Sequence, residues 1–248
     1  SPFFSGARSD EGKRRKPRFC KCCSLWCCCI GTTVTLVVGI VVFALTVWIG
    51  SDMEWRAVVA KGNTKNFYTM DEVCAAPAGS NNYTTYNNVE AAHANDGLVR
   101  HCGDCGDCST ARDIDILDVT KNSLTKTATR CAVQKFFGGR AAVERCFDSD
   151  VGFTPPCTTC WVDNVMCTQN ACVFNCLRSL ILRESNNAES GELNRCLECD
   201  EKMCGPAFIL CAGANRRRSG IVSDIGRDNL AEVCKKVDED WAVGVETG

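Results

Sequence analysis

Apolar residues concentrate in one uninterrupted run near the start of the chain. Residues 30–50 read IGTTVTLVVGIVVFALTVWIG and contain no charged side chain. A helix needs about 20 apolar residues to cross the hydrocarbon core of a bilayer. Trp26 and Trp48 lie near the two ends of the run, where indole rings favour the headgroup layer. The pattern predicts one transmembrane helix over residues 30–50, which serves as an anchor or a packing helix.

The charges on the two sides of this run predict its orientation. Residues 1–29 carry seven Lys or Arg, whereas residues 51–70 carry three. The positive-inside bias leaves the N-terminus on the cytosolic or stromal side and the remaining chain on the opposite side. A cleaved signal peptide is the alternative, but its apolar core is about 7–15 residues long and ends in a small-residue cleavage site, and neither property fits this run.

Beyond the span, a polar stretch precedes apolar residues that recur at helical spacing. Residues 61–96 interleave Gly, Asn, Ser and Thr and indicate an extended or looped lead-in. Four further helices are predicted: from Ser109 or Thr110 to Gly138-Gly139, over 157–183, over 193–204, and along the stripe formed by Leu230, Val233, Cys234, Val237 and Trp241. The expected fold is mainly α, with a single transmembrane helix followed by a disulfide-rich helical domain with an irregular lead-in.

These patterns divide the chain into segments of different character. They are a basic, Cys-rich cytosolic or stromal segment (1–29), the transmembrane helix (30–50), a polar connector (51–100) and a disulfide-stapled helical domain (101–248).

Cysteine content then places the outer part of the chain in an oxidising compartment, because disulfides persist there and not in the cytosol. Sixteen of the 22 cysteines follow the span. An even number permits eight bridges, each contributing about 2–4 kcal/mol, although the sequence does not give their pairing. The cysteines predicted to form disulfides are Cys74, Cys102, Cys105, Cys108, Cys131, Cys146, Cys157, Cys160, Cys167, Cys172, Cys176, Cys196, Cys199, Cys204, Cys211 and Cys234.

Some of these cysteines have spacings that also occur at metal or redox sites. Cys102, Cys105 and Cys108 have the CxxCxxC spacing of iron–sulfur ligands but lack the expected continuation. The pairs Cys157/Cys160 and Cys196/Cys199 fit a zinc site or a redox-active dithiol. The many surrounding cysteines would scramble a labile site, so the disulfide framework is the favoured interpretation. No metal and no cofactor is expected.

A second cysteine cluster lies on the reducing side of the span. It follows a basic segment, and S-acylation of such juxtamembrane cysteines would strengthen membrane attachment. The equal alternative is a membrane-buried run of small apolar residues. The lipidation candidates are Cys20, Cys22, Cys23, Cys27, Cys28 and Cys29.

Charge and histidine content argue against two classes of function. Residues 51–248 carry 21 basic and 28 acidic side chains, which is no footprint for nucleic acid. The two histidines, His93 and His101, have no nucleophile elbow or oxyanion loop near them. We therefore expect no catalytic residues, no enzyme activity and no nucleic-acid partner, and the sequence does not identify a small-molecule ligand.

Two surface features are candidate sites for a partner and for a modification. Arg216, Arg217 and Arg218 follow one another in a loop of small residues. Guanidinium groups so placed can grip a carboxylate, a phosphate or an acidic protein surface, or they can pair with nearby acids of the same chain. Asn82 opens an Asn-Tyr-Thr glycosylation sequon, which is usable if the domain enters the secretory pathway.

The favoured function is that of a non-catalytic structural or linker subunit of a larger membrane complex. Its stapled domain would dock on other subunits in an oxidising lumen, and photosynthetic (thylakoid) and respiratory assemblies are candidate hosts. The alternative is a single-pass cell-surface receptor or adhesin with a disulfide-rich ectodomain. A membrane-tethered thiol-disulfide oxidoreductase is a third, less favoured hypothesis. In each case the lipid bilayer is a partner.

Overall fold

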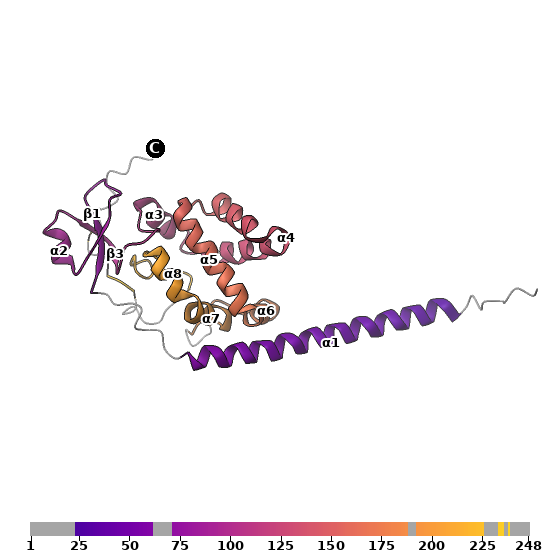
Figure 1. Cartoon of the computed structure of the whole chain (residues 1–248). Coiled ribbons are helices and arrows are strands. Elements are labelled where there is room, and N and C mark those ends of the chain that lie inside the picture. Colours follow the sequence, from indigo (N-terminus) through magenta and orange to yellow (C-terminus); the bar gives the residue numbers. More distant parts are fainter. Residues whose placement is uncertain (1–22, 62–70, 188–191, 226–232, 236–237, 239–248) are drawn as a thin grey trace, which may run out of the picture. The chain divides into compact units, whose positions relative to one another are not determined.

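The structure is a computed structural model of the chain (Figure 1). The chain divides into two compact units, Ser1–Leu45 and Thr46–Gly248. The first helix, α1 (Cys23–Ala60), belongs to both units, and its side chains are described from Gly31 onward. The structure describes residues 23–61, 71–187, 192–225, 233–235 and 238.

The expected apolar helix is present as part of α1. Within the described part of the chain, Gly31–Ala60 is the one helix that is long and apolar enough by itself to cross a membrane. The helix continues beyond the predicted end at Gly50 for ten further residues, to Ala60. These residues include Asp52, Glu54 and Arg56, so the apolar run ends near Gly50 while the helix does not.

The second unit contains the predicted helical domain. Its helices are α3 (Ala111–Val119), α4 (Leu124–Asp150), α5 (Pro155–Ala171), α6 (Val173–Leu182), α7 (Arg195–Met203) and α8 (Gly205–Ala212). α5 is the central helix: it packs against α4, α7 and α8 (Figure 1). The mainly helical, disulfide-rich fold is therefore confirmed.

The boundaries of two predicted helices were wrong. The helix expected to end at Gly138-Gly139 is interrupted between α3 and α4, and α4 then continues past both glycines with a kink. Gly139 has φ +62°, a conformation that glycine adopts without the steric penalty of a Cβ atom. The helix expected over 157–183 divides at Cys172 into α5 and α6, which meet at 88°.

Aromatic residues fill the core of the helical domain around Trp161 of α5. The Trp161 ring stacks on Phe153 at 5.6 Å between centroids and meets Phe208 of α8 edge-on at 4.8 Å. Phe147 of α4 is fully buried beside them. These contacts fix α4, α5 and α8 around one apolar centre, with disulfides supplementing the burial.

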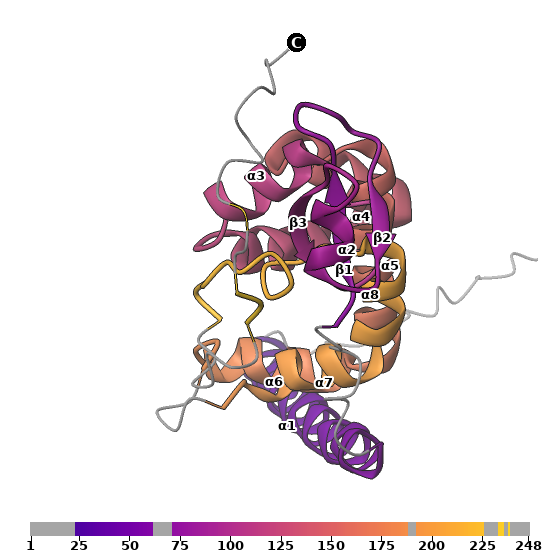
Figure 2. The same ribbon diagram turned by 90° about the vertical axis from the view of Figure 1, so that its left-hand side faces the viewer.

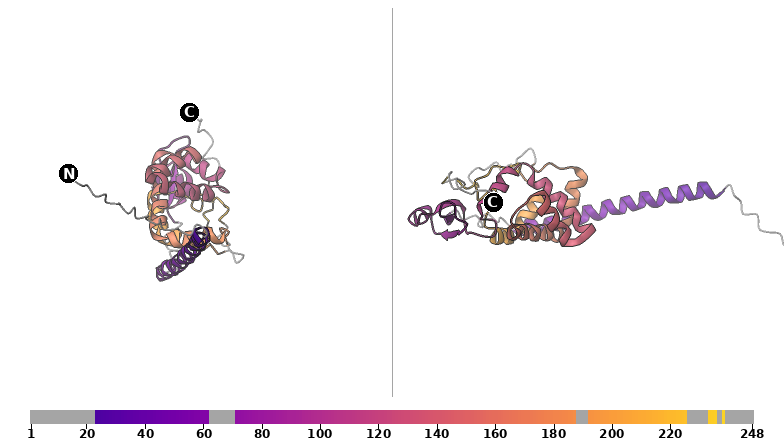
Figure 3. Two further views of the ribbon diagram at one scale, coloured as in Figure 1. Left: turned by 90° about the vertical axis from the view of Figure 1, so that its right-hand side faces the viewer. Right: turned by 90° about the horizontal axis from the view of Figure 1, so that it is seen from above.

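A small antiparallel sheet occupies part of the segment predicted as a polar connector. β1 (Val73–Ala76) lies between β2 (Thr84–Tyr86) and β3 (Leu98–Cys102), and the short α2 (Val89–His93) packs against it. Sheet and α2 lie at one end of the domain (Figure 1, Figure 3). All four residues of β1 are buried, so this segment has more regular structure than its polar composition indicates.

The last predicted helix is not found where the structure describes the chain. Val233, Cys234 and Lys235 are non-helical, whereas the remaining members of the predicted stripe, Leu230, Val237 and Trp241, lie outside the described residues. Cys234 instead donates its backbone N–H to the carbonyl of Arg217 at 2.9 Å and forms a disulfide with Cys102. These long-range bonds prevail over the local helical pattern.

Candidate functional site

Every cysteine predicted to form a disulfide has a partner. Six of the eight bridges involve at least one cysteine of α4, α5, α6, α7 or α8, and two involve only segments outside those helices. The pairs are Cys74–Cys105, Cys102–Cys234, Cys108–Cys157, Cys131–Cys146, Cys160–Cys211, Cys167–Cys204, Cys172–Cys199 and Cys176–Cys196.

The pairing separates the cysteines of both CxxC motifs. Cys157 bonds to Cys108 of the CxxCxxC motif, whereas Cys160 bonds to Cys211 of α8. Cys196 and Cys199 of α7 likewise bond to two different cysteines of the α5–α6 corner. An oxidised thiol-disulfide oxidoreductase closes its disulfide within the CxxC motif. Here each motif joins separate segments, as in a structural framework.

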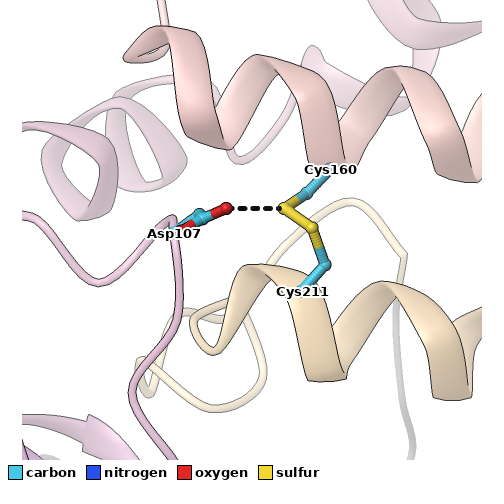
Figure 4. A group of neighbouring side chains, drawn as sticks. All are labelled: Asp107, Cys160 and Cys211. Atoms are coloured by element: carbon cyan, nitrogen blue, oxygen red, sulfur yellow. Dashed lines mark hydrogen bonds between the residues drawn. A yellow bond between two sulfur atoms is a disulfide. The ribbon is translucent and has the colours of Figure 1, made fainter.

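Two carboxylates lie close enough to disulfides to resemble metal-binding groups. Asp150 Oδ2 is 3.7 Å from Cys146 Sγ, and Cys146 is bonded to Cys131. Asp107 Oδ2 is 3.7 Å from Cys160 Sγ, and Cys160 is bonded to Cys211 (Figure 4). Metal ligation requires a thiolate, and a sulfur in a disulfide is not one. In this oxidation state each cluster is a cross-link with an adjacent acid.

His101 and Ser109 form a hydrogen-bonded pair that resembles part of a catalytic dyad. His101 Nε2 lies 2.8 Å from Ser109 Oγ, and His101 Nδ1 lies 2.9 Å from the carbonyl oxygen of Cys102. A carbonyl only accepts, so Nδ1 carries the proton and the serine hydroxyl donates to Nε2. Burial lowers the pKa of His101 to about 4. Both side chains are buried, so the pair joins β3 to the following loop and is not presented to a substrate.

The arginine loop, residues 216–218, is held within the domain by its own side chains. Arg216 bonds to Asp224 at 3.1 Å and Arg217 to Glu201 at 3.2 Å, and their side chains are 13% and 9% exposed. Arg218 is also buried; it donates to the carbonyl of Gly213. The guanidinium groups hold the loop against the helices, which agrees with the alternative that they pair with acids of the same chain.

Residues 48–54, in the C-terminal part of α1, contact α6. This set of contacts is here called the joint. Ser51 Oγ donates to Asn175 Oδ1 at 2.8 Å in a buried contact. The Glu54 carboxylate accepts the backbone N–H groups of Phe174 and Asn175 at 3.0 and 2.8 Å. These amides open α6 and have no partner within the helix, and a carboxylate there interacts favourably with the helix dipole. Gly50 permits the close approach, because a Cβ atom would lie 2.5 Å from the Phe174 ring.

Two arginines extend this joint along α1. The Arg178 guanidinium lies 4.7 Å from the ring centre of Trp48, and that of Arg195 on α7 lies 4.9 Å from Trp55. Arg195 also pairs with Asp52 at 3.2 Å. Figure 2 shows the end of α1 beside α6 and α7. Charged contacts therefore connect residues 46–60 to both helices.

The contacts also fix the direction of α6. As the numbers rise along α6 from Phe174 to Arg178, their partners on α1 fall from Glu54 to Trp48, so the two segments are antiparallel. The C-terminal end of α6 therefore points toward the side of the domain where the apolar run of α1 ends. That end carries three exposed apolar side chains, here named the α6 tip: Leu180, Ile181 and Leu182, which are 53%, 56% and 52% exposed.

The structure describes the side chain of the glycosylation candidate but not those of the lipidation candidates. Asn82 is exposed in the turn that precedes β2, where a glycosyltransferase can reach a sequon. The side chains of the six lipidation candidates, Cys20, Cys22, Cys23, Cys27, Cys28 and Cys29, lie outside what the structure describes.

Comparison with known proteins gives one match. Residues 140–236, which are less than half of the chain, match the model of a family of unknown function (DUF8771). The match includes α5–α8 and the arginine loop. No curated protein and no solved structure matches the chain.

Proposed function

We propose that the chain is a non-catalytic structural subunit of a larger membrane protein complex. α1 anchors it, and the stapled domain docks on partner subunits in an oxidising lumen. The joint between α1 and α6 carries this proposal. A flexible linker needs no buried contact with the domain that it precedes, whereas Ser51, Glu54 and Trp48 connect the C-terminal part of α1 to α6 through side chains within the second unit. Such a connection suits a protein that positions its partners.

The α6 tip supports a proposal about which side of the domain contacts the bilayer. Exposed apolar patches mark surfaces that contact a membrane or another protein, and Leu180, Ile181 and Leu182 lie beyond Arg178, which contacts Trp48. Trp favours the headgroup layer. We therefore place the α6 tip in the same layer, so that the domain rests on the bilayer in one orientation.

We propose that a partner docks at the kink of α4. Phe137 is 82% exposed directly before Gly138, and exposed aromatic side chains are enriched at the centres of protein interfaces. Large photosynthetic assemblies of the thylakoid lumen and respiratory complexes are the classes of host that fit a rigid, stapled subunit.

Native separation of source membranes in mild detergent, followed by mass spectrometry, tests the proposal. We expect the chain to migrate with other membrane proteins in a fixed ratio. Phe137→Ser should release it from them, whereas Val119→Ser, which changes an equally exposed residue (79%) on α3, should not. Migration of the wild-type chain alone would contradict a structural role.

A second function is favoured by the exposed sequon. A cell-surface receptor or adhesin passes through the secretory pathway, where Asn82 would receive a glycan. Treatment with a peptide N-glycosidase should then lower the mass of the wild-type chain and leave Asn82→Gln unchanged. An unchanged wild-type mass removes this support, because a lumenal subunit of an organelle complex does not meet the glycosylation machinery.

A further inference from the structure

A cavity of about 270 Å³ lies inside the helical domain, between α4, α5, α6, α7 and α8. Its walls are largely apolar and include Ala128 of α4, Val165 of α5, Leu177 of α6 and Phe208 of α8. Ligand sites have volumes of about 300–1,000 Å³ and are mainly apolar with a few placed polar groups. The volume is slightly below that range, so it suits one alkyl chain or one fused-ring body better than a two-chain phospholipid.

A polar cluster is set into one wall of this cavity. Asp200 Oδ1 accepts hydrogen bonds from Thr168 Oγ1 and from Asn164 Nδ2, the latter at 3.1 Å. Burial raises the pKa of Asp200 to about 6 and Glu201 adds to this effect, although the two hydrogen bonds lower it. The carboxyl group is thus in an environment that disfavours negative charge.

Three buried polar atoms around the cluster have no hydrogen-bond partner among the residues that the structure describes. They are Trp161 Nε1, Asn164 Oδ1 and Gln169 Oε1, and all three residues line the cavity. An unsatisfied buried donor or acceptor costs about 1–3 kcal/mol. Trp161 Nε1 is a donor and Asn164 Oδ1, about one turn along α5, is an acceptor, so a group that accepts one hydrogen bond and donates one would satisfy this pair. A hydroxyl group has this property.

Among the described residues that line the cavity, each positive charge is paired with an acid. Arg216 and Arg217 line it, but they are paired with Asp224 and Glu201 at 3.1 and 3.2 Å. Asp200 adds a further acid to the lining. A carboxylate or phosphate headgroup would therefore meet carboxylates, whereas an uncharged hydroxyl would not.

Exposed apolar residues at the edge of the cavity give such a ligand a route from the bilayer. Val133, Phe136 and Leu180 line the cavity and are exposed at the surface. Leu180 also belongs to the α6 tip. An apolar ligand can thus pass from the membrane interface into the cavity along these apolar side chains.

We infer that the cavity binds an amphipathic lipid with a hydrocarbon body and one uncharged hydroxyl headgroup. The hydroxyl lies between Trp161 Nε1 and Asn164 Oδ1, and the hydrocarbon contacts α4 and α6. The ligand can be a sterol or a long-chain alcohol, which share this chemistry. The inference goes beyond partner docking: a chain that migrates alone in detergent could still take up the alcohol.

Photolabelling of the full-length chain in nanodiscs tests this inference. The probes are a diazirine sterol and a diazirine long-chain alcohol, and labelled peptides are located by mass spectrometry. We expect saturable labelling within α4, α5 or α6 by at least one probe, and the probe that labels identifies the body of the ligand. Unlabelled alcohol of the same body should compete, and stearate should compete about tenfold less well.

Variants that change the cavity lining test whether the cavity is the binding site. Ala128→Phe fills the cavity and should lower labelling about tenfold, whereas Leu210→Phe, at an exposed site outside the lining, should not. Trp161→Phe, which removes the Nε1 donor and keeps an aromatic ring, should reduce the preference for alcohol over stearate. The disulfide map of each variant, compared with that of the wild type, checks its folding.

Three outcomes would overturn the inference. They are labelling by neither probe within α4–α6, equal competition by stearate and alcohol, and unchanged labelling in a folded Ala128→Phe variant. Loss of partner co-migration with labelling intact would instead count against the proposed structural role alone.

Discussion

The half-buried carboxyl group of Asp200 makes the stability of this domain depend on pH. Asp200 has a pKa of about 6 in the folded protein, against an ordinary value of 3.8, because burial disfavours its charge. The folded state therefore binds its proton more tightly than the unfolded state. The resulting stabilisation is present at low pH and is lost as the pH rises through about 6.

Asp200→Asn should abolish this dependence while keeping the side-chain shape. The difference in unfolding free energy between variant and wild type should grow by up to about 3 kcal/mol from pH 4 to pH 7, in favour of the variant. Guanidinium chloride unfolding of the detergent-solubilised chain with intact disulfides measures it. A constant difference across this range would show that Asp200 is not desolvated.

Residue-level contacts were the least accessible from the sequence. Glu54 and Phe174 are joined across a separation of 120 residues, and no local pattern marks either as a member of a joint. The arginine loop was recognised as unusual, but Arg217 is paired with Glu201, an acid that sequence reasoning did not select. Partners of this kind depend on how the helices pack.

At the scale of elements, α6 depends on a cap that another helix supplies. Its N-cap residue, Cys172, makes no side-chain hydrogen bond to it, and the Glu54 carboxylate of α1 accepts the amides of Phe174 and Asn175 instead. A capping carboxylate contributes about 1 kcal/mol through hydrogen bonds and the helix dipole.

Glu54→Gln should loosen this cap, because the amide keeps one acceptor and loses the charge. Hydrogen exchange at the amides of Phe174 and Asn175 should accelerate about three- to tenfold. Met53→Gln, at the exposed neighbouring position, provides the matched control and should leave the exchange unchanged. If both variants behave alike, Glu54 does not hold the joint.

The α6 tip yields a prediction about membrane contact. A photoreactive phospholipid in nanodiscs should label residues 180–182, and the triple change Leu180→Gln, Ile181→Gln and Leu182→Gln should remove most of that labelling, because amide side chains avoid hydrocarbon. Leu210→Gln, at another exposed leucine, should have no effect. If residues 180–182 of the wild-type chain are not labelled, the α6 tip does not contact the bilayer.

Elements were predicted well where the local signal is strong and poorly where distant bonds decide. The uncharged run over 30–50 and the helices of the 101–248 segment carried such signals. β1 is four small or branched residues, VCAA, too short to stand out. The stripe around Cys234 has helical spacing, but the disulfide to Cys102 and the hydrogen bond to Arg217 hold its described residues in an irregular conformation.

At the scale of the whole molecule, the number of cysteines was more informative than their spacing. An even count predicted a fully bonded framework, and the sixteen form eight bridges. Their pairing could not be predicted, since neighbours such as Cys157 and Cys160 bond to segments 49 and 51 residues away. The cavity could not be predicted either, because its lining comes from five helices and from the segment that follows α8, which are far apart in the sequence.

A map of reactive thiols in sealed membrane vesicles is the most direct test of the central claim, a single anchor with a stapled domain in an oxidising compartment. After hydroxylamine treatment to release acyl groups, an impermeant maleimide should react with Cys20–Cys29 from the cytosolic or stromal side alone. The sixteen cysteines from Cys74 to Cys234 should react from neither side until the protein is denatured and reduced. Free thiols among those sixteen in the native protein, or labelling of both groups from one side, would contradict the claim.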